Sequence, residues 1–401
     1  MNAEIKNKIS ECGLPIVIYG ASTVGEVLAD ELARNNIQVS VFCDYNINKA
    51  GKYFCGKEVI HISQLKERYP RAFFIISAAE IIEVRKKLEE SGYFDYMSGS
   101  AILEEINVYE RDYGKPSEFV EYTVSTCINC HKNLLEKESL FARSIDFIIT
   151  QKCSLKCRDC SNLAQYYKNP ENFEEKKLYK EIDRLCGLFD QINEIRLIGG
   201  EPFMHPKACE IAKYLAGKKV IGKVVIFSNG TLPFNENMTS LLKDPKILIL
   251  FSDYGNALSR NLSKNEEICM AEDIAFLTTK LEGWVDCCSM APHGGSEQEI
   301  RQKFMECCSK NVFSAAQGKL YRCPFLANAF QLKGIPDRKE DYLDFMEESI
   351  DTNEMKEKIK NFLFFKDNMP SCDFCNGRPL TAPADVEPAV QLKEAVEYES
   401  Y

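Results

Sequence analysis

The chain has 401 residues, of which 45% are hydrophobic and 27% are charged, as is typical of a globular protein with two or three domains. Its formal net charge is −10, and because no cluster of Lys or Arg offsets it, nucleic acid and membrane surfaces are disfavoured as partners. The sequence carries no secretory signal and no apolar run of the roughly 18 residues that a membrane span needs, which predicts a cytoplasmic protein.

The first segment, residues 1–105, predicts a small α/β domain. Apolar strands are expected at Ile16–Tyr19, Val39–Phe42 and Phe73–Ile76, and amphipathic helices follow the first and third of them. This alternation predicts a doubly wound sheet with helices on its faces. Residues 106–140 are polar and weakly periodic, so they are interpreted as a linker.

A turn in this segment resembles a dinucleotide-binding fingerprint. Gly20, Ser22 and Gly25 have the spacing G-x-S-x-x-G, and Asp44 ends the second strand. In the fingerprint the glycines allow the turn and the acid reaches a ribose hydroxyl, but Ser22 narrows the space for a pyrophosphate. The segment also resembles the small Rossmann-like domains that precede enzymes of bacterial surface-sugar biosynthesis. Three hypotheses stay open: bound NAD, a bound nucleotide or nucleotide-sugar, and a structural or docking domain.

A second α/β region is predicted over residues 141–300, where the alternation of strands and helices restarts. Repeated βα units predict a parallel sheet whose ligands bind at the carboxyl ends of the strands. Four strands are expected, at Asp146–Thr150, Glu194–Ile198, Val224–Phe227 and Ile247–Phe251.

The cysteines point to metal chemistry. Eighteen cysteines beside four histidines are too many for an ordinary cytosolic chain, and thiolate-bound metal is the economical explanation. Cys153, Cys157 and Cys160 have the spacing C-x3-C-x2-C directly after the strand that ends at Thr150. Three such thiolates can hold three corners of a [4Fe-4S] cluster and leave one iron open for substrate chemistry. On spacing alone, a zinc site completed by a distant residue is the alternative.

Two companion motifs follow the next two strands. Gly199, Gly200 and Glu201 end the second strand, and Ser228 and Asn229 end the third. In this order and spacing, the cysteine loop and the two motifs resemble the radical SAM superfamily. The resemblance implies a partial (βα)6 barrel whose three cysteines bind a [4Fe-4S] cluster, with S-adenosylmethionine (SAM) on the fourth iron. A reductant such as flavodoxin or ferredoxin would reduce the cluster, which would cleave SAM to a 5′-deoxyadenosyl radical that abstracts a substrate hydrogen.

The same resemblance assigns contacts to SAM. The turn after the second strand would bind its ammonium group, and the pair after the third strand would contact its ribose or carboxylate. The residue before the third cysteine is usually aromatic in the family and helps to seat the adenine, but here it is Asp159. Tyr166 or Tyr167 could take over that contact.

A second set of cysteines lies in the last third of the chain. Cys308, Gly318 and Cys323 give the pattern C-x9-G-x4-C, and Cys372 and Cys375 add C-x2-C. This pattern resembles the twitch version of the SPASM extension, which implies an auxiliary [4Fe-4S] cluster with four cysteine ligands. The glycine would make a tight hairpin between two flanking cysteines. Four ligands leave no open iron, which favours a role as electron relay.

The sequence leaves open which metal the second set of cysteines binds and which cysteines bind it. The auxiliary domain is expected over residues 301–380, and a zinc site of the C-x2-C type is the alternative to its cluster. Cys307 could replace Cys308, because C-x10-G also lies within the family range. Residues 381–401 form an acidic, Pro/Ala-rich tail that is expected to be partly disordered.

Weaker signals concern the substrate and the remaining cysteines. Asp253 and Tyr254 follow the fourth strand and are candidates for substrate contact, although a strand-terminal Asp also caps turns. His293 follows another apparent strand and is a similar candidate. Cys127-x2-Cys130-His131 fits a haem or metal motif or plain linker cysteines, and Cys287-Cys288 is a further candidate pair.

The leading functional hypothesis is a radical SAM enzyme of the oxidoreductase type that oxidises or otherwise modifies a carbohydrate or nucleotide-sugar. Its basis is the four-cysteine second site, which twitch enzymes that oxidise cyclitols or aminosugars share, and the N-terminal segment. The first alternative is a peptide-modifying maturase, since SPASM and twitch extensions also occur there. The second alternative is a non-catalytic iron-sulfur redox sensor.

Overall fold

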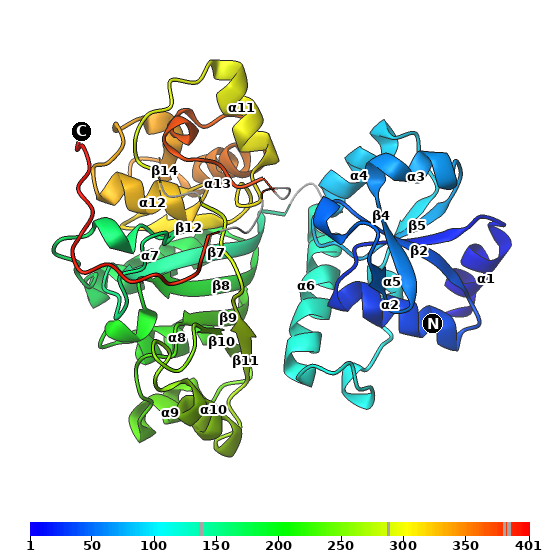
Figure 1. The fold of residues 1–401 in the computed structure, drawn as a ribbon, viewed down its shortest axis with the longest axis horizontal. Helices are drawn as coiled ribbons and strands as arrows, with labels where there is room; N and C mark the ends of the chain where they lie inside the picture. The colour runs from blue at the N-terminus through cyan, green and yellow to red at the C-terminus, as the bar shows by residue number, and fades with distance from the viewer. Residues whose placement is uncertain (136–138, 287–288, 380–381, 383–385) are drawn as a thin grey trace. The chain divides into compact units, whose positions relative to one another are not determined.

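The computed structural model of the chain shows two compact units, Met1–Ser139 and Leu140–Tyr401. Each unit is built on a sheet rich in parallel strands with helices packed against it, which confirms the α/β class (Figure 1). Among the helices that the structure describes, none is both long and apolar enough to cross a membrane. The described residues are 1–135, 139–286, 289–379, 382 and 386–401.

The first unit holds a six-stranded sheet in the order β3-β4-β2-β1-β5-β6. Five strands run parallel, and only β3 pairs antiparallel, with β4. Because β1 lies between β2 and β5, the direction of winding reverses there, as in a doubly wound fold. The strands are β1 (Ile16–Tyr19), β2 (Val39–Asp44), β3 (Tyr53–Phe54), β4 (Lys57–His61), β5 (Phe73–Ile76) and β6 (Tyr96–Ser98).

Both faces of this sheet are covered, so all four residues of β1 are buried. Ile16 and Ile18 pack into one core, and Val17 and Tyr19 pack into the other, as expected for a strand whose side chains alternate. The first core takes helices α1 (Ala3–Glu11), α2 (Thr23–Arg34), α5 (Ser100–Leu103) and α6 (Ser117–Leu135), and the second takes α3 (Ile62–Arg68) and α4 (Ile81–Glu90). Two short helices, η1 (Ile47–Lys49) and η2 (Val108–Glu110), complete the unit.

Residues 106–140, predicted as a linker, instead contain the 19-residue helix α6. It packs against α2, α4 and α5. Val120, Val124 and Cys127 enter the core at helical spacing, but Thr, Ser and Asn residues between them weaken the periodicity of the sequence. The boundary between the units therefore falls after Ser139.

The second unit holds an eight-stranded open sheet in the order β11-β10-β9-β8-β7-β12-β13-β14. The first six strands in this order are parallel, and β13 and β14 continue the sheet antiparallel. The four predicted strands are confirmed, and β12 of the cysteine-rich region extends the same sheet. The bounds are β7 (Phe141–Thr150), β8 (Gln191–Gly199), β9 (Ile221–Ser228), β10 (Ile247–Asp253), β11 (Phe276–Lys280), β12 (Phe313–Ala316), β13 (Lys319–Tyr321) and β14 (Tyr342–Asp344).

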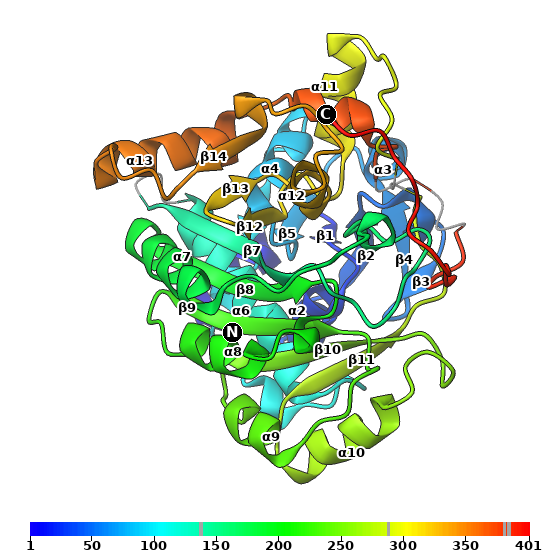
Figure 2. The same cartoon turned by 90° about the vertical axis from the view of Figure 1, so that its left-hand side faces the viewer.

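Helices cover one face of this sheet, with α7 and α8 in front of it in Figure 2. Leu178, Ile182 and Leu185 of α7 point into the core, as their spacing predicts. The longer helices are α7 (Glu175–Leu188), α8 (Ala208–Ala216), α9 (Glu236–Leu242), α10 (Leu262–Ala271), α11 (Glu297–Glu306), α12 (Pro324–Gln331) and α13 (Thr352–Lys360). The short ones are η3 (Ala164–Tyr166), η4 (Pro202–Met204), η5 (Lys339–Asp341), η6 (Asn361–Phe365) and η7 (Pro370–Phe374).

Candidate functional site

The three cysteines of the loop after β7 lie close to one another. Cys157 is buried, and Cys153 and Cys160 are half-buried. Burial raises the pKa of the Cys153 and Cys157 thiols, that of Cys157 to about 11, and the nearby Cys160 raises both further. Thiolates in such a setting need a compensating positive charge, which a bound metal cluster would supply.

Hydrogen-bond donors point at two of these sulfurs. Cys153 Sγ accepts from the backbone N of Leu155 at 3.5 Å and from Asn229 Nδ2 at 3.7 Å. Cys157 Sγ accepts from Gln391 Nε2 at 3.2 Å. Donors of this kind stabilise thiolates that bind iron-sulfur clusters.

The donor set, three thiols on one loop, fits an iron-sulfur cluster, and zinc remains the alternative. Among the described residues, no three His, Cys, Asp or Glu side chains are placed to hold one metal ion. A zinc ion would need its sulfurs gathered about one point, at 2.3 Å from the metal. In a cubane each cysteine binds a different iron, so its three sulfurs stand further apart than sulfurs around one zinc ion.

Both glycines at the end of β8 are needed because the cysteine loop passes against them. A Cβ atom on Gly199 would lie 2.3 Å from the carbonyl oxygen of Thr150, and one on Gly200 would lie 2.3 Å from that of Lys152. The backbone N of Glu201 donates to Lys152 O at 2.8 Å. The turn after β8 and the start of the cysteine loop therefore form one packed unit.

The Glu201 side chain joins the ends of two strands. Its carboxylate is buried, and it accepts from the backbone N of Asn229 at 2.7 Å and from that of Phe203 at 3.3 Å. Burial raises the pKa of Glu201 to about 7 against the lowering effect of these hydrogen bonds. The structure thus gives Glu201 a bridging role between β8 and β9, and its contact with the ammonium group of SAM stays a prediction.

Asn229 connects the end of β9 to the cysteine loop. Its Nδ2 donates to Ser154 Oγ at 3.2 Å, and its Oδ1 accepts from Thr231 Oγ1 at 2.7 Å. Ser154 and Thr231 also share a hydrogen bond, and neither was among the predicted site residues. The sequence signal that could have found these two residues is a hydroxyl side chain close to a residue of the motifs. Ser228 Oγ accepts from the backbone N of Gly230 at 3.2 Å, and the Ser228 side chain also hydrogen-bonds to the Glu201 carboxylate.

Three residues near the third cysteine are candidates for the predicted adenine contact, and their surroundings differ. Asp159 pairs with Arg158, with 2.8 Å between Oδ2 and Nε. Tyr167 is buried, and its hydroxyl donates to Asn328 Oδ1 of α12 at 3.1 Å. Tyr166 is half-buried in η3. Because Tyr167 is enclosed and hydrogen-bonded, Tyr166 is the better aromatic candidate.

Of the residues predicted to contact substrate, Tyr254 lies at the cysteine loop. Burial raises the pKa of its phenol, and the three cysteines of the loop raise it further. Its ring packs edge to face against Trp284 with 5.7 Å between centroids. Asp253 instead caps a turn, since its Oδ1 accepts from the backbone N of Gly255 at 2.7 Å, as the alternative prediction held.

The expectation that His293 follows a strand is wrong. The preceding strand among the described residues, β11, ends at Lys280. His293 is exposed, and its backbone N donates to the carbonyl of Asp373 at 3.1 Å, between two cysteines of the second set.

The second set gathers Cys307 and not Cys308. Burial raises the pKa of the Cys323 thiol, and Cys307, Cys372 and Cys375 raise it further. Cys375 and Cys307 have the same effect on Cys372. Cys308 is exposed, and it acts on its neighbour Cys307. The structure therefore favours Cys307, the alternative ligand that the sequence left open, and the ligand set itself stays a prediction.

Hydrogen-bond donors and a tight hairpin surround this set. Backbone N–H groups donate to the sulfurs of Cys307, Cys323 and Cys375 at 3.4, 3.5 and 3.3 Å. β12 and β13 form a hairpin whose two turn residues, Gln317 and Gly318, both have positive φ, +49° and +78°. Such a turn matches the twist of a hairpin and favours Gly at its second position.

In the first unit, the acid of the nucleotide fingerprint is already engaged. Gly20 has φ +119°, and a Cβ atom on Gly25 would lie 2.1 Å from the Gly20 carbonyl oxygen, so both glycines are required. Asp44 Oδ2 accepts from the backbone N of Ala21 at 3.0 Å and from Lys49 Nζ at 2.8 Å. Asp44 thereby holds the turn itself, and nucleotide binding stays a prediction.

The Cys-x2-Cys-His motif belongs to the packing of α6. His131 is buried, with Nδ1 2.7 Å from Ser98 Oγ and Nε2 2.8 Å from the carbonyl oxygen of Ala78. Cys127 Sγ lies 3.5 Å from the same Nε2. Both ring nitrogens are used within the unit, which favours a structural role. Cys287 and Cys288 lie outside the described residues.

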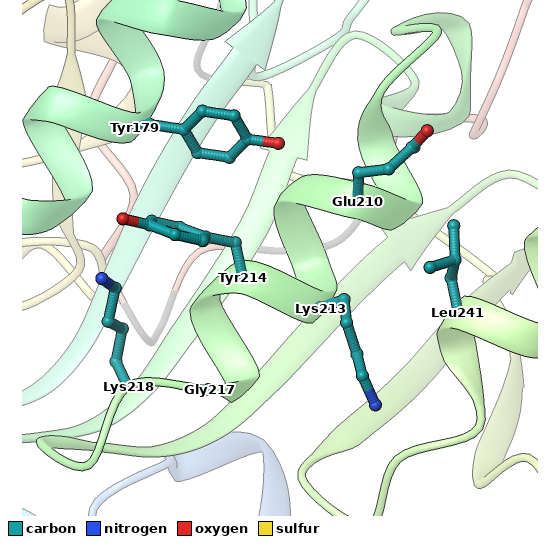
Figure 3. Close-up of a pocket in the computed structure, with 7 residues that line it drawn as sticks. All are labelled: Tyr179, Glu210, Lys213, Tyr214, Gly217, Lys218 and Leu241. Atoms are coloured by element: carbon teal, nitrogen blue, oxygen red, sulfur yellow. The ribbon is translucent and has the colours of Figure 1, made fainter.

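A hollow of about 470 Å³ lies elsewhere, on the outer side of α7 and α8 (Figure 3). Its aromatic floor is the pair Tyr179 and Tyr214, whose rings are 4.6 Å apart. None of the predicted site residues lines it, and it is open to solvent. The lining residues are Tyr179, Glu210, Lys213, Tyr214, Gly217, Lys218 and Leu241.

Comparison with solved structures gives similarities at low scores. BtrN in complex with AdoMet and 2-DOIA shares 14% identity over 63% of this chain and 98% of that chain, with a TM-score of 0.41. Native anSMEcpe with bound AdoMet and Cp18Cys peptide shares 13% over 63% and 92%, with a TM-score of 0.36. Streptococcus suis SuiB bound to precursor peptide SuiA shares 12% over 75% and 82%, with a TM-score of 0.33.

The family comparison concerns the part of the second unit that holds the site. Residues 147–259 match the model of the Radical SAM superfamily. The matched stretch contains the cysteine loop after β7 and the turns after β8 and β9. This match indicates an enzyme that uses a [4Fe-4S] cluster and cleaves SAM. The second unit thus contains a domain that matches the radical SAM superfamily.

Proposed function

We propose that this chain abstracts a hydrogen atom from a carbohydrate or nucleotide-sugar and oxidises it. The observation that carries the proposal is the meeting of Cys153, Cys157 and Cys160 with the turns after β8 and β9 at one edge of the sheet. When bound there, the cluster and SAM would supply a 5′-deoxyadenosyl radical. The family match supports SAM cleavage, and the substrate class is our inference.

The chain's own residues fix the geometry of this site and limit its contact with water. The hydrogen bonds among Asn229, Ser154 and Thr231 fix the cysteine loop to the end of β9. Tyr254 and Trp284 place aromatic surface beside the loop. The Tyr254 phenol carries its proton at neutral pH, so it can donate a hydrogen bond to a substrate oxygen. Aromatic walls also limit the access of water to a radical.

The second cysteine set supports an oxidative outcome. We assign Cys307, Cys323, Cys372 and Cys375 as ligands of an auxiliary [4Fe-4S] cluster, on the strength of their proximity and of the N–H donors at three sulfurs. When bound, such a cluster would supply an electron acceptor, since four cysteine ligands leave no iron open to substrate. Loss of one hydrogen atom, one electron and one proton amounts to a two-electron oxidation of the substrate.

A buried polar strip lies on the sheet of the second unit. Ser144 and Asp146 alternate with Ile145 and Phe147 along β7, so the two polar side chains share one face of the strand. Asp146 Oδ1 accepts from Arg196 Nε of β8 at 2.5 Å, and β12 contributes Ser314 in register with Asp146. The hydroxyls of Ser144 and Ser314 have no hydrogen-bond partner among the described residues. Ser144, Asp146 and Ser314 are buried, so the strip belongs to the interior of the sheet and carries no argument about the substrate.

The test is a deuterium-transfer screen under strict anaerobiosis. The reconstituted protein is incubated with SAM, a strong reductant and either deuterated nucleotide-sugars or deuterated peptides, and 5′-deoxyadenosine is analysed by mass spectrometry. Deuterium from a sugar is expected. Deuterium from peptides alone would replace our substrate class with the peptide-modifying alternative.

A cysteine control separates the enzyme from a redox sensor. The triple variant Cys153→Ala, Cys157→Ala, Cys160→Ala is expected to lose SAM cleavage and about half of its iron, and the exposed Cys55→Ala to lose neither. Wild-type protein that holds iron but fails to cleave SAM would support the sensor instead.

A further inference from the structure

Residues 386–401, which we call the strap, run along the second unit and are drawn in red in Figures 1 and 2. This segment belongs to the predicted acidic tail, yet it makes defined contacts in place of the expected partial disorder. It begins in an antiparallel bridge, in which the backbone N of Trp284 donates to Val386 O at 2.8 Å and the N of Val386 donates back at 3.0 Å. Trp284 is the residue that packs on Tyr254.

The strap then pairs with the cysteine loop itself. The backbone N of Arg158 donates to Val390 O, and the backbone N of Leu392 donates to Lys156 O, both at 2.8 Å. These two hydrogen bonds flank an antiparallel bridge between Cys157 and Gln391. Backbone pairing on both sides of the residue therefore fixes the position of Gln391 beside a predicted cluster ligand.

The orientation of the Gln391 amide is set at both of its ends. Its Oε1 accepts from the backbone N of Lys156 at 2.9 Å. Its Nε2 donates to Cys157 Sγ at 3.2 Å and to the carbonyl oxygen of Ala389 at 2.7 Å. A flipped amide would place an oxygen against Ala389 O and the sulfur, and would turn its NH2 toward another N–H. Only one orientation satisfies all three partners, and it aims a donor at the sulfur.

The other end of the strap is anchored near the second cysteine set. Tyr401 packs edge to face on Phe374, which lies between Cys372 and Cys375, with 5.7 Å between ring centroids. The hydroxyl of Tyr398 donates to the carbonyl oxygen of Leu332 at 2.8 Å. One segment thus pairs with the first cysteine loop through Gln391 and packs on Phe374, a neighbour of two cysteines of the second set.

We propose that Gln391 is a positioning residue for the first cluster, which donates a hydrogen bond to the Cys157 thiolate and raises the reduction potential of the cluster. This inference rests on the proposed function. Reduction adds negative charge that the ligand sulfurs share, so a donor at a sulfur favours the reduced state. The cluster must be reduced before SAM can be cleaved, and the strap makes that step easier.

The experiment measures potential as well as turnover. Gln391→Glu keeps an oxygen for Lys156 and replaces the donor by a second oxygen, whereas Gln391→Ala removes both contacts. Lys393→Ala is the matched control, because Lys393 lies on the strap, is exposed, and has no hydrogen bond among those described. Each reconstituted protein is titrated without SAM, and its EPR signals are recorded at each potential. The first cluster is identified as the signal that changes when SAM is added to a parallel sample.

We expect both Gln391 variants to keep wild-type iron content and to be harder to reduce. At the wild-type midpoint, the ratio of reduced to oxidised first cluster should fall about tenfold in Gln391→Glu, which is about 59 mV for one electron. Gln391→Ala should shift in the same direction by less, and Lys393→Ala should not shift. Loss of iron in the Gln391 variants alone would also support a positioning role.

Two results would overturn the proposal. Equal midpoints at equal iron in wild type and both Gln391 variants would reject the donor, and an equal shift in Lys393→Ala would show that any change on the strap has the same effect. Either result leaves SAM cleavage, and with it the proposed function, intact. A wild-type protein that takes up no iron would reject the proposed function and this inference together.

Discussion

The two cysteine sets are assembled in different ways. The first takes Cys153, Cys157 and Cys160 from one loop that follows a single strand. The second collects its thiols from the end of α11, the end of β13 and the η7 region. A local loop fixes its ligands through spacing, whereas a set drawn from distant points depends on how the chain folds. This difference explains why the ligands of the second set were ambiguous in the sequence.

The sharpest test of this difference compares two adjacent cysteines. Cys307→Ala is expected to remove the auxiliary cluster and about half of the iron, because Cys307 faces the other three thiols. Cys308→Ala should retain both clusters, since Cys308 is exposed. Iron and sulfide analysis with EPR of the anaerobic proteins measures this. The reverse pattern would restore the ligand set predicted from spacing.

The first set can be broken without touching a cysteine. Gly200→Ala places a Cβ atom 2.3 Å from Lys152 O, so the cysteine loop must move and the first cluster should be lost, at a cost of about 2 kcal/mol in unfolding free energy. Gly187→Ala is the matched control in α7, where no atom lies within 4 Å of the new Cβ, and it should stabilise by up to about 1 kcal/mol. Denaturant unfolding and iron analysis measure both.

A Gly200→Ala protein with a full complement of iron would mean that the loop tolerates displacement. The packing of the turn after β8 against the loop would then be incidental to cluster binding. Loss of iron in Gly187→Ala as well would point to a general loss of fold.

The second set is supported from α7 by Glu181, and this contact should depend on pH. Burial raises the pKa of Glu181 to about 7, although the backbone N–H of Gly318 donates to it. Because the folded protein favours the neutral acid, its unfolding free energy should fall as the pH rises from about 4.5 to about 7, by up to about 3 kcal/mol. Glu181→Gln should remove that slope and be the more stable form above pH 7. Chemical denaturation at several pH values measures it.

The control for this slope is Glu348→Gln. Glu348 is exposed, so its replacement should leave the pH profile of stability as in wild type. A slope that survives in Glu181→Gln would assign it to another buried acid.

Features that depend on residues close in sequence were predicted, and features that depend on residues far apart in sequence were not. The strands of both sheets and the loop of Cys153 were predictable because apolar runs and short spacings are local properties. The helix Ser117–Leu135 was missed because polar residues dilute its apolar face. Gln391 was missed because it is 234 residues from Cys157, and no local pattern indicates that such residues meet.

The smallest expected change in unfolding free energy concerns the strap, residues 386–401. The hydroxyl of Tyr398 donates to Leu332 O at 2.8 Å, and its removal in Tyr398→Phe should cost about 1 kcal/mol of unfolding free energy. Glu397→Gln breaks the pair with Lys168, in which both side chains are mostly exposed, and should change stability by less than about 0.5 kcal/mol. Denaturant unfolding of the two variants ranks them. If Glu397→Gln were the more damaging, surface charge and not the Tyr398 hydrogen bond would hold the strap, and the strap would loosen at high salt.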